Sequence, residues 1–146
     1  MTTTLRIRRA LLAPAFIALM AGCSTDGITG KSTSAVAGTY SAIVFRVTPS
    51  GQSPIDVLSQ GGNLTIAIDR SGAATGTLNV PASAAGGTAF SASMSGTATV
   101  DGNTVRFQQT ADTFVRNLSW TVNGQQLVVS NQVVAGTSYS ITLISI

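Results

Sequence analysis

The side chains that most often carry out chemistry in proteins are scarce in this chain, which narrows its function. The sequence has no histidine and no glutamate, and its one cysteine is Cys23. Nucleophile–base pairs that depend on histidine are excluded, because the base is missing. The usual zinc ligand sets are excluded for the same reason. We expect no enzymatic activity, no metal site and no cofactor.

Five aspartates supply all the acidic side chains, and they are scattered along the chain. None belongs to an Asp-x-Asp-x-Asp-Gly loop of the kind that binds calcium. Four of the five stand at turn or linker positions, where a short carboxylate commonly hydrogen-bonds its own backbone. We therefore interpret them as turn residues: Asp26, Asp56, Asp69, Asp101 and Asp112.

The segment 107–120 has the richest mixture of side chains. It holds two phenylalanines, the one tryptophan, and an acid and a base four residues apart. One interpretation makes it the mouth of a pocket, with the aromatic rings below and Arg116 facing an anionic ligand. The interpretation that we favour makes Asp112 and Arg116 an ion pair that holds a corner of the fold, with Phe114 and Trp120 in the core.

The N-terminus has the layout of an export signal. Residues 1–9 carry three arginines and no acid, and residues 10–21 form an apolar run broken only by Pro14. A positive segment followed by an apolar run of 7–15 residues is typical of a secretory signal. The run is shorter than the roughly 20 residues that span a bilayer. We predict that residues 1–22 are a signal peptide.

The end of this signal, Met20-Ala21-Gly22-Cys23, resembles the lipobox of bacterial lipoproteins. The resemblance implies that the Cys23 thiol carries diacylglycerol and that the chain is cut just before this residue. Two or three acyl chains such as palmitate would anchor it firmly, since each buried methylene contributes about 0.8 kcal/mol. It also implies a place in the bacterial cell envelope. Ser24 is similar to the pattern of outer-membrane lipoproteins, on the periplasmic or surface side.

The positive net charge of the whole chain does not indicate a nucleic-acid partner. The net charge of +3 includes three arginines of the signal. From Cys23 onward, five basic and five acidic side chains cancel. No basic patch remains to follow a phosphate backbone, so we expect no nucleic-acid partner.

Two regions follow the predicted cleavage site. Residues 24–37 are small and polar and show no periodicity, which is typical of a flexible coil. We predict that residues 23–37 are a lipidated flexible tether. From residue 38 the chain alternates between apolar and polar side chains, as half-buried strands do. We predict one β-domain over residues 38–146.

About eight strands are expected in this domain, with no convincing helix. In the first of them, Ile43 shares the inward face with Phe45 and Val47, and Tyr40 lies on the opposite face. We expect the interior to be filled mainly by Phe45, Ile66, Met94, Phe107, Trp120 and Ile141. The strands are expected over residues 39–48, 63–69, 74–80, 90–100, 104–110 and 118–122, then from Leu127 and from Tyr139.

Short turns join most of these strands, and Asn123-Gly124 is a strong hairpin signal. An open sheet would leave an unpaired edge, which closure removes. We therefore predict an all-β fold, a single small antiparallel up-and-down barrel. The alternative is a two-sheet β-sandwich.

The domain is similar to small lipocalin-like domains of lipoproteins. The similarity is carried by the opening Gly38-Thr39-Tyr40, by the turns at 69–72 and 101–103, and by Asn123-Gly124. It implies a barrel that can carry a small ligand.

Two functions are consistent with the sequence. The first is a membrane-anchored structural or interaction module that packs against an envelope protein partner. The alternative is a lipocalin-like binder of a small apolar or anionic ligand. The volume of the interior separates them, because a ligand pocket needs roughly 300 Å³ or more.

Overall fold

The computed structural model of the chain describes residues 31–146. The predicted signal peptide of residues 1–22 and the lipid attachment site at Cys23 lie outside the described residues. The strands are β1 (Gly38–Pro49), β2 (Ile55–Asp56), β3 (Asn63–Ile68), β4 (Ala73–Val80), β5 (Phe90–Asp101), β6 (Thr104–Gln109), β7 (Ser119–Asn123), β8 (Gln126–Val134) and β9 (Thr137–Ser145). The described residues also contain two short 3-10 helices, η1 (Thr33–Val36) and η2 (Phe114–Asn117).

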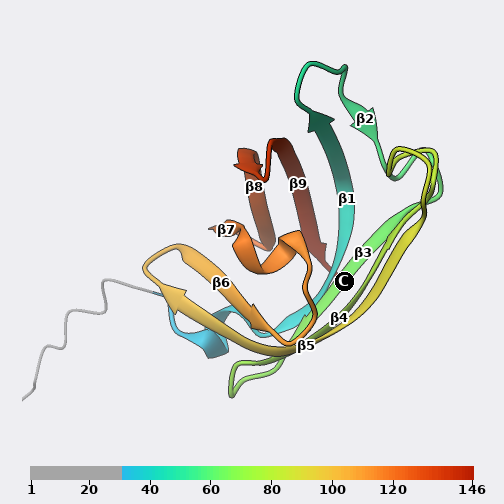
Figure 1. Cartoon of the computed structure of the whole chain (residues 1–146). Coiled ribbons are helices and arrows are strands. Elements are labelled where there is room, and N and C mark those ends of the chain that lie inside the picture. Colours follow the sequence, from blue (N-terminus) through green and yellow to red (C-terminus); the bar gives the residue numbers. More distant parts are fainter. Residues whose placement is uncertain (1–30) are drawn as a thin grey trace, which may run out of the picture.

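Eight of these strands form one closed antiparallel barrel (Figure 1). Each strand from β3 to β8 pairs with the next along the chain, and β1 closes the sheet by pairing with both β3 and β9. The two-residue β2 is an extra strand that pairs with the far part of β1, where Arg46 lies opposite Asp56. The prediction of an eight-stranded up-and-down barrel is confirmed, and the alternative of a β-sandwich is wrong.

The interior of the barrel is filled by side chains. All six residues that the sequence indicated as interior are buried. Trp120 and Phe107 meet edge to face, with ring centroids 6.0 Å apart. Apolar residues from all eight barrel strands join them in one continuous cluster. The barrel therefore has a solid centre of the kind expected for eight strands.

The inward face of β1 differs from the prediction at its beginning. Ile43 is 50% exposed, whereas Tyr40 is buried and donates a 2.8 Å hydrogen bond from its hydroxyl to the Val36 carbonyl. The cause is an irregularity between Ala42 and Val44, where the register with β9 shifts. An extra residue of this kind reverses the alternation of side chains before it relative to those after it. Phe45 and Val47, which follow this irregularity, are buried as predicted.

The predicted tether also differs from the structure over its last residues. Thr33–Val36 form η1, and the Val36 side chain is only 1% exposed. The Lys31 amide donates a 3.0 Å hydrogen bond to the carbonyl of Gly102. The expectation of a flexible coil up to residue 37 is therefore wrong from Thr33 onward. Val36 is the one large apolar side chain among residues 33–37, and its burial in the barrel core fixes the backbone around it.

The two ends of the barrel are built differently. At the hairpin end, tight turns at 69–72, 102–103 and 124–125 join neighbouring strands, and η1 packs nearby. At the open end lie the connections 50–62, 81–89 and 110–118, which are much longer, together with the short turn 135–136. Figure 1 shows β2 and the loop between β4 and β5 rising on the same side of the molecule.

Candidate functional site

A cleft of about 510 Å³ lies at the open end of the barrel, and we call it the open-end cleft. Its walls come from the end of β1 and the loop to β2, from the loop 81–89, and from the start of β9. Its lining residues are Val47, Pro49, Gln52, Ile55, Val80, Ser83, Ala84, Ala85, Gly86, Phe90, Phe114, Thr137 and Tyr139.

Aromatic rings form a layered group beside this cleft. The rings of Phe114 and Tyr139 are stacked, with centroids 4.3 Å apart and an angle of 18° between their planes. Phe45 lies behind Phe114 at 6.0 Å, tilted by 49°. Phe90 begins β5 at the rim and remains 39% exposed, which is unusual for so large an apolar side chain. The rings therefore extend from the buried core out to the cleft.

The open-end cleft carries no formal charge, because none of its lining residues is acidic or basic. Its polar groups are the amide of Gln52 and the hydroxyls of Ser83, Thr137 and Tyr139. Burial raises the pKa of the Tyr139 phenol, and a hydrogen bond with Thr137 offsets part of that increase. The phenol is therefore neutral at physiological pH and can donate or accept a hydrogen bond.

The four residues that the sequence singled out do not form one site. Phe114 lines the open-end cleft, whereas Trp120 lies wholly in the core. Asp112 and Arg116 form an ion pair of 2.6 Å on the surface, where both side chains are exposed. Arg116 borders a different hollow, which is lined by residues of β5, of β6 and of the connection after β6. The ion pair is present and Trp120 is buried, whereas Phe114, which the favoured interpretation placed in the core, is only partly buried.

The indole of Trp120 has one unusual feature. Its Nε1 atom is buried and has no hydrogen-bond partner among the described residues. Leaving such a donor unpaired costs about 1–3 kcal/mol. The ring nevertheless belongs in the core, because its packing outweighs that cost.

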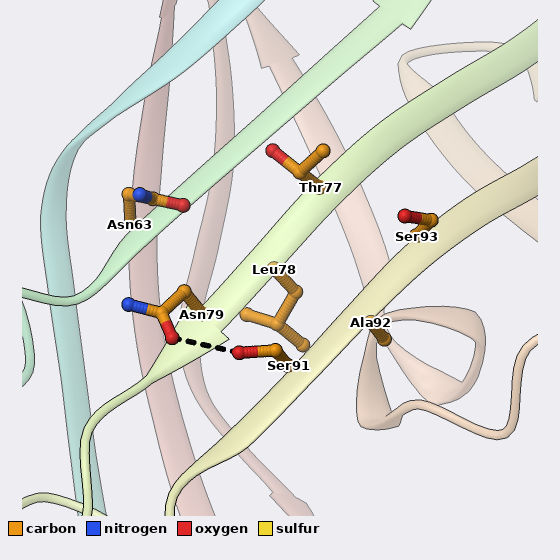
Figure 2. A pocket seen from close by; sticks show the side chains of 7 residues that line it. All are labelled: Asn63, Thr77, Leu78, Asn79, Ser91, Ala92 and Ser93. Atoms are coloured by element: carbon orange, nitrogen blue, oxygen red, sulfur yellow. Dashed lines mark hydrogen bonds between the residues drawn. The ribbon is translucent and has the colours of Figure 1, made fainter.

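A further hollow, of about 360 Å³, lies on the outer face of β3, β4 and β5 (Figure 2). Asn63, Thr77 and Ser93 border it, and the Ser91 hydroxyl donates a 2.8 Å hydrogen bond to the Asn79 side chain. These amides and hydroxyls can hydrogen-bond to a neutral polar group. None of these side chains is ionisable near neutral pH, so the hollow contains no acid, base or activated nucleophile.

Two turn aspartates of the described part of the chain, Asp56 and Asp69, accept hydrogen bonds from the backbone of their own turns. The Asp69 carboxylate accepts hydrogen bonds from the Ser71 hydroxyl at 2.6 Å and from the backbone amides of Ser71 and Ala73. The bond from the Ser71 hydroxyl lowers the pKa of Asp69 most. Among residues 31–146, no three potential metal ligands gather. No helix of this part of the chain is long and apolar enough to cross a membrane.

No protein-family model, curated protein or solved structure matches this chain. Its function must therefore be inferred from its own residues. Nothing in the sequence marks Phe90 or Tyr139 as site residues, because both fit the alternation of a strand. The signal that could have found the cleft is the length of the connections 50–62 and 81–89, which far exceed what a hairpin needs.

Proposed function

We propose that this chain is a lipid-anchored protein of the bacterial envelope, and that its barrel is an interaction module acting through the open-end cleft. The lipobox-like sequence ending in Cys23 supports the anchor. One observation carries the rest. The centre of the barrel is filled, and the open-end cleft lies at the end opposite to the one where the chain arrives from Cys23.

The reach of the chain supports this orientation. Cys23 precedes Lys31 by eight positions, which span at most about 28 Å when fully extended. Lys31 is bonded to Gly102 at the hairpin end. Strand β5 runs from Asp101, next to that turn, to Phe90 at the cleft, and its 12 residues cover roughly 36 Å. An anchor at Cys23 would hold the hairpin end near the bilayer and leave the cleft facing away from it.

The cleft also favours a second candidate, a binder of a small apolar molecule. Its volume of about 510 Å³ exceeds the roughly 300 Å³ that a ligand pocket needs. The cleft does not support binding of an anionic ligand, since Arg116 lies outside it. The two candidates share one site and differ in whether a protein or a small molecule occupies it.

Membrane fractionation of the full chain in a bacterial host tests the anchor. We expect the wild type to stay with the membranes after a high-salt wash and the Cys23→Ser variant to be released. Ser24→Ala is the matched control and should behave like the wild type, because it keeps the thiol. Retention of Cys23→Ser in the washed membranes would contradict the lipid anchor.

Native mass spectrometry of the protein purified from its host separates the two candidates. An interaction module should appear at the mass of the lipidated chain or of a complex with another protein. A bound molecule of a few hundred daltons would favour the small-ligand binder.

A further inference from the structure

We propose that the open-end cleft is a binding site for an uncharged, flat ring molecule that stacks on the exposed aromatic side chains of the cleft. This inference rests on the second candidate function, in which a small molecule occupies the cleft, and it names the chemical class of that molecule. Three properties of the cleft carry it: its charge, its rings and its size.

The charge of the lining excludes ionic ligands. Arg46 and Arg116, which could recognise an anion, are absent from the lining, and no aspartate is present to meet a cation. A buried ion without a partner is strongly unfavourable, so an ionised ligand would lose its hydration without compensation. A neutral molecule loses little on entering such a cleft.

The rings favour a flat occupant. Phe114 and Tyr139 already stack at 4.3 Å, and Phe90 exposes its ring at the rim of the same cleft. Stacked and edge-to-face arrangements stabilise aromatic pairs by about 0.5–1.5 kcal/mol beyond the area that they bury. A ligand ring can extend this group, whereas an acyl chain gains only from the buried area.

The size and walls of the cleft favour a small molecule. Its volume of about 510 Å³ falls within the usual range of ligand sites. One wall, the loop 81–89, consists mainly of small residues, so the large side chains of the lining come from the other walls. The side chains of Gln52 and Tyr139 place hydrogen-bonding groups around the rings, and these would fix the orientation of a ligand with one polar substituent.

Binding of N-phenyl-1-naphthylamine, an uncharged molecule with fused rings, tests this proposal. The full chain with Cys23→Ser carries the whole barrel without the lipid and serves as the parent protein. Trp120 is the one tryptophan of the sequence, so energy transfer from its emission to the probe reports binding close to the barrel. We expect saturable binding of one probe molecule per chain.

Substitutions in the parent protein locate the site. Phe90→Ser should raise the dissociation constant about tenfold, because it removes one ring contact and the apolar area that this ring buries. Ile43→Ser is the matched control, because Ile43 is similarly exposed and apolar but lies outside the cleft. Tyr139→Leu should weaken binding as Phe90→Ser does, and Tyr139→Phe should restore it.

Competition identifies the class of ligand. Unlabelled phenanthrene should displace the probe, whereas hexadecanol and naphthalene-1-sulfonate should not. Displacement by hexadecanol as effective as that by phenanthrene would overturn the proposal in favour of an acyl chain. Non-saturable binding, or equal losses in Phe90→Ser and Ile43→Ser, would also overturn it. These outcomes leave the anchor and a protein partner intact, because fractionation and native mass spectrometry test those separately.

Discussion

The hairpin end and the open end of this barrel both connect neighbouring antiparallel strands, but their connections differ in length. At the hairpin end the connections are turns of two to four residues, and the Asp69 carboxylate ties one of them together with three hydrogen bonds. At the open end three connections have nine residues or more, and they surround the uncharged cleft. The long connections contain residues that strand pairing does not need, and these residues are available for recognition.

The two ends share one core, so the largest effects should come from its centre. Trp120→Ala should lower the free energy of unfolding by about 3–5 kcal/mol, the usual cost of removing a large buried ring. Urea unfolding followed by circular dichroism measures this loss. The structure of both ends should be lost in a single transition.

Trp120→Phe is the control for that variant. It keeps a ring against Phe107 and removes an Nε1–H that has no partner among residues 31–146, so it should cost much less. If Trp120→Ala abolished probe binding without changing the free energy of unfolding, Trp120 would belong to the cleft and the ends would not share this core.

At the hairpin end the next largest effect should come from η1. Val36→Ala should lower the free energy of unfolding by about 2 kcal/mol, because it removes two buried methyl groups. Val133→Ala, at a side chain that is 68% exposed, should change it by less than about 0.5 kcal/mol. Equal effects of the two variants in urea unfolding would show that η1 does not belong to the folded domain.

The smallest effect is expected at the surface ion pair beside the open end. Arg116→Ala should cost less than about 1 kcal/mol, because exposed pairs gain little in water. Asp112→Ala should give a similar value, and the double variant should equal either single one. Thermal unfolding in low salt resolves such differences. A loss of several kcal/mol would mean that this pair holds the corner of the barrel.

The two ends also differ in how well the sequence predicted them. The strands, the turn at Asn123-Gly124 and the closure of the barrel could be predicted, because alternation and turn chemistry are local. The exposure of Ile43 could not, since one extra residue in β1 shifts the alternation without an obvious local signal. Nor could the burial of Val36, whose contacts form only when the barrel exists.

The open-end cleft was the hardest feature to predict. Ile55, Phe90, Phe114 and Tyr139 lie far apart in the sequence, and only closure of the barrel brings them to one cleft. The segment 107–120 has the richest mixture of side chains, yet only Phe114 of its four candidate residues lines the cleft. Local patterns located the strands, whereas the site depends on contacts between distant connections.

Hydrogen–deuterium exchange of the full-length Cys23→Ser chain, with and without N-phenyl-1-naphthylamine, tests the difference between the ends most directly. We expect the probe to slow amide exchange in residues 81–90 and around Phe114 and Tyr139, and to leave the turns at 69–72, 102–103 and 124–125 unchanged. Protection at those hairpin turns, or on the outer face of β3, β4 and β5 without any change at 81–90, would contradict the assignment of the binding site to the open end.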